Sequence, residues 1–276
     1  MLNSQKKLEC FLHALERSDS SIDAREKEKI VRYVQENGVE MIPYAFKESY
    51  SPKDVEIRTD AETGKRYALF RGKKMFFPQN RTNRRMKNYF NDLFLEQDER
   101  SPHAYTPRDY PISYKGRVIA DVGAAEGIFA LSVIEECKYA YLFECDHEWI
   151  EALRCTFAPW KEKVMIVEKF VGREGDPEAQ TITLDSFFDG KEVDFIKADI
   201  EGAEMDMLSG ANRILEEKIT ALAVCAYHEK EHEQSIRELL GKKGFQTTTT
   251  SGYMIDAWAE CPSLVRGVVL AQKQSA

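Results

Sequence analysis

A short segment that contains two acids and two glycines follows an apolar run at residues 118–122. Residues 121–127 read Asp-Val-Gly-Ala-Ala-Glu-Gly. Gly123 allows a sharp turn and a close approach of a ligand to the main chain, and Gly127 allows the following helix to pack closely on the strand. Ligands of parallel sheets bind beyond the carboxyl ends of the strands. Asp121 and Glu126 would repel a pyrophosphate but attract a positively charged ligand. The alternative is a tight turn without a ligand.

A second acidic position follows the next apolar run, residues 141–143. Glu144 comes directly after this run, about 20 residues beyond the first loop, where an acid typically accepts hydrogen bonds from ribose hydroxyls. Asp146 instead can cap the next helix. The two positions together predict a ligand that contains a nucleoside.

Acids are densest where the run 195–200 meets a predicted helix at 203–216. Asp199 lies inside the apolar run, where a buried carboxylate without partners is costly. Lys197 lies on the same face of the strand because side chains alternate, so the two groups could pair directly. Acids in a first helical turn complement the helix dipole, but this does not explain Asp199. We therefore expect Asp199 to be functional.

Two histidines could reach the same edge of the sheet. His228 follows the run 221–225 and can accept the proton of an acceptor hydroxyl; the alternative is a polar residue that caps the next helix. His103 follows a proline and could enter the cleft from the N-terminal side. The acids at 199–204 could bind Mg²⁺. Acids at a helix terminus without a metal are more common, and we predict no metal site.

Such residues need a scaffold in which several strands end at one edge. From about residue 115, short apolar runs alternate with amphipathic stretches. This pattern predicts a doubly wound, Rossmann-like α/β domain with a mostly parallel sheet covered on both faces. The predicted strands are 118–122, 141–143, 164–167, 195–200 and 221–225, and the predicted helices are 128–137, 148–157 and 203–216.

Residues 1–112 predict a smaller, mainly helical region over the cleft. Apolar residues at helical spacing run through residues 1–50; short strand pairs turn near residues 62–65 and 71–72, and 88–96 reads as a helix. A basic run without any acid is formed by Arg71, Lys73, Lys74, Arg81, Arg84, Arg85 and Lys87. With its interleaved aromatic residues it suits an anionic acceptor. The alternative is a solvated surface.

The composition is that of a soluble globular protein. The 276 residues have a net charge of −8, with 43% hydrophobic and 31% charged residues, and this acidic balance argues against nucleic acid as a partner. No apolar run reaches the roughly 18 residues that span a membrane, and the N-terminus does not resemble a signal peptide. None of the six cysteines forms a Cys-x-x-Cys pair. We therefore expect a cytoplasmic protein with free, mostly buried thiols.

The three strand-end motifs together resemble the FkbM family of methyltransferases. The similarity covers residues 115–228 and includes 121–127, 143–144 and the Thr-Leu-Asp-Ser-Phe-Phe segment at 183–188. Its most specific block is Asp-Phe-Ile-Lys-Ala-Asp-Ile-Glu-Gly-Ala-Glu at 194–204. Residues 96–105 are similar to an upstream segment of some bacterial members, whereas residues 247–268 match nothing in the family.

This resemblance implies S-adenosyl-L-methionine as cofactor and an oxygen of a small molecule or glycan as methyl acceptor. It implies a seven-stranded sheet whose last strand, near residues 264–270, is antiparallel. It places Asp199 near the transferred methyl group, and Asp199 and His228 are the candidate catalytic residues. The residues implied to bind the cofactor are Asp121 and Gly123 at the methionine end, Ala124, Ala125, Glu126 and Gly127 beside them, Glu144 and Cys145 at the ribose, Phe170 and Val171 near the adenine, and Asp199.

Two regions are predicted: residues 1–112 as an N-terminal helical or lid region, and residues 113–276 as the S-adenosylmethionine-binding methyltransferase domain. The alternative function is a non-catalytic Rossmann-like protein that binds a nucleoside or a partner. A dehydrogenase is disfavoured because the Gly-x-Gly-x-x-Gly pattern is missing. A nucleic-acid amino-methyltransferase is disfavoured because Asp199-Ile-Glu-Gly stands in place of an Asn/Asp-Pro-Pro-aromatic run.

Overall fold

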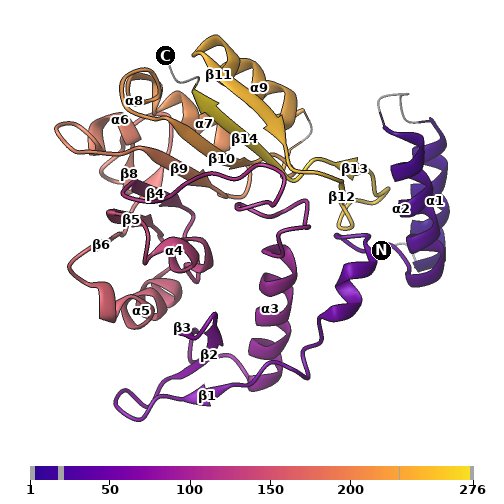
Figure 1. The fold of residues 1–276 in the computed structure, drawn as a ribbon, viewed down its shortest axis with the longest axis horizontal. Helices are drawn as coiled ribbons and strands as arrows, with labels where there is room; N and C mark the ends of the chain where they lie inside the picture. The colour runs from indigo at the N-terminus through magenta and orange to yellow at the C-terminus, as the bar shows by residue number, and fades with distance from the viewer. Residues whose placement is uncertain (1–3, 18–21, 230, 274–276) are drawn as a thin grey trace.

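The computed structural model describes residues 4–17, 22–229 and 231–273 and contains the predicted α/β domain (Figure 1). Its seven-stranded sheet has the order β11-β14-β10-β9-β4-β5-β6. The strands are β4 (Val118–Val122), β5 (Tyr139–Phe143), β6 (Val164–Val167), β9 (Phe195–Ala198), β10 (Ala221–Cys225), β11 (Phe245–Thr249) and β14 (Val268–Lys273). β14 runs antiparallel to β10 and β11, and the other neighbouring pairs are parallel. The predicted fold class is confirmed.

The strand order predicts where along the sheet a ligand would bind. The chain runs from β4 through β5 to β6 on one side and then returns to β9 on the other side of β4. Ligands of such sheets bind at the point where this direction reverses. That point lies between β4 and β9, and the parallel register there pairs Asp121 with Lys197.

Helices cover both faces of the sheet, and α4 is shorter than predicted, whereas α5 has the predicted length. They are α4 (Ile128–Val133), α5 (His147–Thr156), α6 (Leu184–Phe187), α7 (Glu204–Ser209), α8 (Asn212–Glu217) and α9 (His232–Lys242), with a 3-10 turn η2 (Ala158–Trp160) and a small parallel pair, β7 (Phe170–Val171) and β8 (Thr181–Ile182). The single helix predicted at 203–216 is wrong. It breaks at Gly210, which packs against the Gly172 backbone, and α8 restarts where Asp185 accepts the N–H groups of Arg213 and Ile214.

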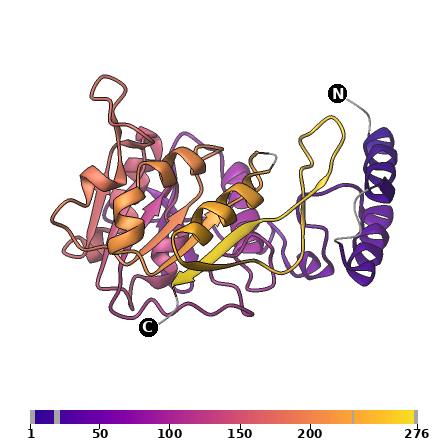
Figure 2. The same cartoon turned by 90° about the horizontal axis from the view of Figure 1, so that it is seen from above.

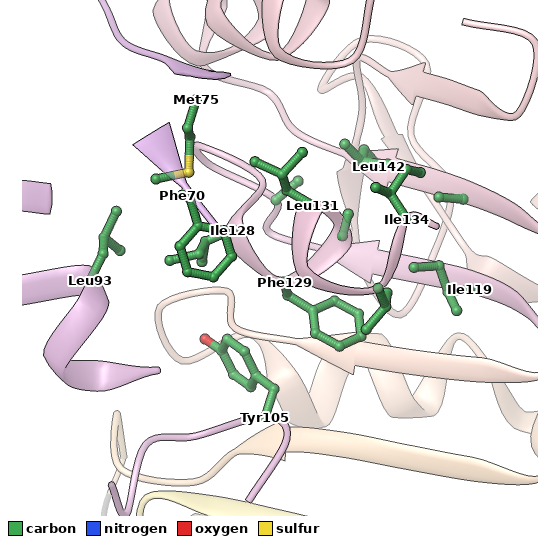
Figure 3. Close-up of a cluster of buried hydrophobic side chains, with 14 of the residues drawn as sticks. Phe70, Met75, Leu93, Tyr105, Ile119, Ile128, Phe129, Leu131, Ile134 and Leu142 are labelled. Carbon is green, nitrogen blue, oxygen red and sulfur yellow. The ribbon is translucent and has the colours of Figure 1, made fainter. Parts of the chain in front are cut away.

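Two hydrophobic clusters bury the faces of the sheet. Along β4, Ile119 belongs to one cluster and Ala120 to the other, as alternation of side chains requires. The first cluster also contains N-terminal residues such as Leu93 and Tyr105, and Tyr105 packs edge-on against Phe129 of α4 (Figure 3). The N-terminal region is therefore fixed to the α/β domain through a shared core.

The N-terminal region has two parts. The helices α1 (Ser4–Arg17) and α2 (Ala24–Asn37) lead through the 3-10 turn η1 (Ala45–Ser49) to a small antiparallel sheet, β1 (Arg58–Thr59), β2 (Arg66–Phe70) and β3 (Lys73–Phe76), and then to α3 (Asn83–Glu96). The expected helices and both strand pairs are present. Figures 1 and 2 show α1 and α2 at one end of the molecule, away from α4 and α5.

Residues 250–267, which belong to the segment that resembles nothing in the family, pack on α1 and α2. β12 (Met254–Ile255) and β13 (Leu264–Val265) form a hairpin. Tyr253, Ile255 and Leu264 share a hydrophobic cluster with α1 and α2. Residues 250–267 therefore hold the N-terminal helices rather than extend the binding edge.

The expectation of six free thiols is wrong. Cys10 of α1 and Cys261 of the β12–β13 hairpin form a disulfide across 251 residues of sequence. No local spacing indicates this pair, because only the packing of the hairpin on α1 brings the two together. The four free cysteines are Cys137 and Cys225, which are buried, and Cys145 and Cys155, which are half-buried. Among the residues that the structure describes, no helix is both long and apolar enough to cross a membrane.

Candidate active site

A cavity of about 320 Å³ lies at the carboxyl ends of β4 and β9. Its walls come from α3, from the segment that follows α3, from the loop after β4 and from the ends of β9 and β10. The lining residues are Tyr89, Asp92, Leu93, Glu96, Gln97, His103, Tyr105, residues 123–126, Ile128, Phe129, Lys197, Asp199, Glu201 and Tyr227. The predicted loop and Asp199 thus share one cavity. The expected cover over the cleft comes from α3 and residues 97–105, whereas α1 and α2 contribute no lining residue.

The two glycines of the loop leave room for neighbouring parts of the chain that pack closely against them. Gly123 has φ of +73°, and a Cβ there would lie 1.9 Å from the Asp199 carbonyl oxygen. Gly127 has φ of +80°, and its Cβ would lie 2.6 Å from Phe157 and 2.8 Å from Leu153. Both positions are in the left-handed region that glycine tolerates. Gly123 therefore packs against the backbone that follows β9. Gly127 packs against α5 and the residue that follows this helix, and not against a strand.

Lys197 pairs with Asp121 and not with Asp199. Its Nζ lies 3.0 Å from Asp121 Oδ1 and donates to the Gly123 carbonyl at 2.6 Å. Burial lowers the pKa of Lys197, but Asp121 and Asp199 outweigh it and hold this pKa above its usual range. Burial also raises the pKa of Asp121 against the influence of Lys197. We take the pair as ionised because the two charges are in contact. Asp121 is fully buried and does not line the cavity.

Asp199 is the centre of a polar network. The Tyr105 hydroxyl donates to Asp199 Oδ2, His103 Nε2 lies 3.7 Å from the same oxygen, and His228 Nε2 lies 3.4 Å from Oδ1. Burial raises the pKa of Asp199, but the charge of Lys197 and the hydrogen bond from Tyr105 outweigh it and lower the value. Asp199 is therefore ionised at neutral pH.

The two histidines have opposite electrostatic surroundings. His228 Nδ1 lies 2.9 Å from Glu204 Oε1, and its side chain is only 10% exposed. Burial lowers the pKa of His228, but Glu204, Asp199 and Glu201 raise it overall. His103 is buried with Nε2 at 3.1 Å from the Tyr227 hydroxyl, and burial lowers its pKa to about 4. His103 is thus a neutral hydrogen-bonding group, whereas His228 can hold a proton.

Acids dominate the charged groups on the cavity wall: Asp92, Glu96, Glu126, Asp199 and Glu201 face one ammonium group, that of Lys197. Burial raises the pKa of Glu126 to about 7, although Tyr89 donates to its Oε2 at 2.8 Å. Burial, together with Asp199 and Glu126, raises the pKa of Glu96 well above its usual range. A cation that enters the cavity would be stabilised, and it would favour the ionised form of both groups.

The predicted ribose and adenine residues lie outside the cavity wall. Glu144 accepts the N–H groups of Ala125 at 2.8 Å, Cys145 at 2.7 Å and Asp146 at 2.8 Å, so it ties the loops after β4 and β5 together. On β7, the Phe170 ring is 55% exposed and Val171 is buried. Asp146 also caps α5 through Glu148 N, which was the alternative role considered for it.

No residue of the basic run lines the cavity. Lys74 pairs with Asp60, and Arg81 lies 3.4 Å from Glu148. Arg71 lies over the Phe70 ring and lines a second hollow of about 560 Å³, which shares Gln97 with the first.

Within the described residues, two groups bring ligand-type atoms within 4.8 Å of one another: His103, Asp199 and Cys225, and Asp199, Glu204 and His228. In the second, Glu204 Oε1 and His228 Nδ1 are engaged in their mutual hydrogen bond. In the first, the Cys225 thiol contacts the Tyr105 hydroxyl at 3.9 Å. Each group thus contains atoms that already make a hydrogen bond or a close polar contact.

Residues 156–247 match the methyltransferase FkbM domain. A solved structure of methyltransferase FkbM from Methylobacillus flagellatus KT is 19% identical, with a TM-score of 0.51 over 69% of this chain and 53% of that one. The match thus spans about half of the Methylobacillus chain. Precorrin-6y C5,15-methyltransferase from Geobacter metallireducens GS-15 is 13% identical, with a TM-score of 0.41 over 58% and 82% of the two chains. No curated protein matches the sequence.

Several residues that line the cavity, among them Tyr89, Glu96 and Tyr105, were not predicted as site residues. Tyr105 belongs to the segment 96–105, whose similarity to upstream family segments was a usable signal. Tyr89 and Glu96 lie on α3. Helical spacing predicts which residues share one face of this helix, but it does not predict which part of the protein that face contacts. Glu204 was considered as an acid in a first helical turn and as a possible Mg²⁺ ligand, and the structure shows it fully buried and bonded to His228.

Proposed function

We propose that this protein is an S-adenosylmethionine-dependent O-methyltransferase that acts on a hydroxyl group of a small molecule or glycan. The observation that carries the proposal is the contact between ionised Asp199 and the His228 imidazole, 3.4 Å apart, at the edge of a cavity in an FkbM domain. A hydroxyl beside this pair has a charged acceptor to orient it and an imidazole to take its proton.

The cavity fits a positively charged cofactor. S-adenosylmethionine, when bound, supplies a methyl group activated by a sulfonium. The acids of the wall complement a positive charge, since Lys197 is already paired with Asp121. We propose that residues 123–127 hold the methionine end, and that Asp121 acts by fixing Lys197.

For the nucleoside we propose Glu144 and Cys145 at the ribose and Phe170 and Val171 at the adenine. Glu144 is half-buried, and its carboxylate can accept ribose hydroxyls beside the N–H groups it already binds. The exposed Phe170 ring offers an apolar face for a base.

Methyl transfer mainly requires alignment of the two reactants. In the proposed geometry Asp199 and Tyr105 orient the hydroxyl, and His228 takes its proton as the oxygen bonds to the methyl carbon. Proton removal by a positioned base contributes roughly 10²–10⁴-fold in rate.

The test is calorimetry with S-adenosylmethionine, followed by incubation with methyl-labelled cofactor and a library of hydroxylated acceptors. We expect binding, and a Glu144→Ala variant should lose at least roughly tenfold in affinity, since it loses contacts to the ribose and to the loop. Asp146→Ala, two residues away and exposed, is the matched control and should bind normally. Failure of the wild-type protein to bind the cofactor or to label any acceptor would refute the proposal.

We further propose that the N-terminal region selects the acceptor. Because the cavity wall is acidic, the part of the acceptor that enters it should be neutral or cationic, and any anionic part should lie outside, toward Arg71 and the rest of the basic run. Replacement of Arg81, Arg84 and Arg85 by Ala should raise the acceptor KM and weaken its salt dependence while cofactor affinity holds. If neither changes, the basic run is only a solvated surface.

A further inference from the structure

Glu204 is a fully buried carboxylate at the start of α7. Its Oε1 accepts the N–H of Ile200 at 2.9 Å and contacts His228 Nδ1 at 2.9 Å. Its Oε2 lies 3.5 Å from His232 Nδ1, and neither of these two atoms has a hydrogen-bond partner among the described residues. Burial raises the pKa of Glu204, but the contacts with His228 and Ile200 outweigh it and lower the value. Because a buried carboxylate is energetically costly, we expect Glu204 to have a function.

The contact with Glu204 decides which nitrogen of His228 carries the proton. A carboxylate at Nδ1 requires Nδ1–H, so in the neutral imidazole the lone pair lies on Nε2. Nε2 is the atom that lies 3.4 Å from Asp199 Oδ1 and 3.8 Å from Glu201 Oε2. Without Glu204 the ring could rotate or take the other tautomer, and either change would remove the lone pair from the side of Asp199.

We infer that Glu204 is a positioning residue that holds the Nδ1–H tautomer of His228 and thereby directs Nε2 at the acceptor hydroxyl. This inference rests on the proposed methyl transfer. In that step the hydroxyl proton passes to Nε2, the oxygen forms a bond to the methyl carbon, and the carbon–sulfur bond breaks with its electron pair left on sulfur. The imidazolium that results is stabilised by Glu204, as a buried carboxylate stabilises the imidazolium of a catalytic triad.

The charged and titratable groups around His228 come from several elements. Asp199 and Lys197 belong to β9 and its end, and Glu201 and Glu204 to the turn and helix that follow. His103 approaches from the segment after α3, His232 of α9 contacts Glu204, and Glu229 is the next residue in the chain. The three carboxylates near the ring favour its protonated form, whereas burial opposes it.

The test is Glu204→Gln, with the pH profile of kcat/KM as the main readout. The loss of one carboxylate should lower the pKa of His228, so the acidic limb of the profile should move to lower pH. The rate should fall by roughly 10–100-fold, as for other residues that orient a functional histidine, with cofactor affinity unchanged. Asp206→Asn is the matched control: it lies on the same helix, is largely exposed and pairs with Arg173 at 2.9 Å, and it should change neither quantity.

A second readout does not depend on activity. Nitrogen NMR of the His228 ring should show Nδ1–H in the neutral wild-type protein and a lower pKa in Glu204→Gln. A neutral ring with the proton on Nε2, or an unchanged pKa in a folded variant, would overturn the inference while leaving the proposed methyl transfer intact. Normal NMR behaviour without methyl transfer would instead count against the proposed function alone.

Discussion

At the scale of residues, burial and neighbouring charge divide the cavity acids by role. Asp199 is ionised because the charge of Lys197 and the hydrogen bond from Tyr105 outweigh its burial. Glu126 is more deeply buried and accepts a side-chain hydrogen bond from Tyr89, and its pKa rises to about 7. One acid is therefore a constant negative charge, whereas the other changes its charge near neutral pH.

This difference predicts that cofactor affinity depends on pH. Glu126 is negative above its pKa and neutral below it, so a cationic ligand should bind a few-fold more weakly at about pH 6 than at about pH 8. Calorimetry at several pH values measures this change. A Glu126→Gln variant should bind more weakly and lose most of the pH dependence. If wild type and variant show the same dependence, Glu126 does not face the cofactor charge.

At the scale of elements, contact between β4 and β9 positions the site. The loop after β4 can touch the end of β9 only because residue 123 has no side chain. A Cβ there would lie 1.9 Å from the Asp199 carbonyl oxygen, so it would displace the residue at the centre of the network. The loop glycine and the acid of the next motif are therefore one structural unit.

Gly123→Ala and Gly116→Ala test this conclusion as a matched pair. Both glycines have φ of +73°, but an added Cβ at Gly116 meets nothing within 4 Å. Gly116→Ala should cost about 1–2 kcal/mol, the strain of the backbone alone. Gly123→Ala should cost more than about 4 kcal/mol or abolish cofactor binding. Equal free energies of unfolding for the two variants, with binding intact, would contradict this role of Gly123.

At the scale of the whole molecule, the two ends of the chain are fastened together away from the cavity. Cys10 joins α1 to Cys261 of the β12–β13 hairpin, and their cluster contains no cavity residue. This unit stabilises the position of α1 and α2, whereas α3 and residues 97–105 form the cavity wall. The N-terminal region therefore has a structural half and a half that belongs to the site.

Loss of the disulfide should loosen one end of the molecule only. In Cys10→Ser, or after reduction, α1 and α2 should exchange amide hydrogens faster, because the tether that restricts their opening is gone. Cofactor affinity should be unchanged. Cys155→Ser, which removes a free, half-buried thiol, is the control and should leave α1 and α2 protected. Weaker cofactor binding in Cys10→Ser would show that the tether also supports the cavity.

The sequence by itself determined the sheet, its helical cover and the acids at its strand ends. Hydrophobic runs and their spacing are local properties, so residues 118–122, 164–167 and 221–225 were assigned as strands with the bounds that the structure has. The break between α7 and α8 was missed because Asp185 and Gly172, which cause it, lie more than one element away in the chain.

Only the tertiary structure decided which groups meet. Lys197 pairs with Asp121 because β4 and β9 are neighbours in one register, although the alternation of side chains had suggested Asp199. Tyr105 reaches Asp199 across 94 residues, and Cys10 reaches Cys261 across 251. Such contacts depend on how the elements pack, and periodicity along the chain carries no information about packing partners. The strand-end acids were therefore predictable, whereas the network that sets their charge was not.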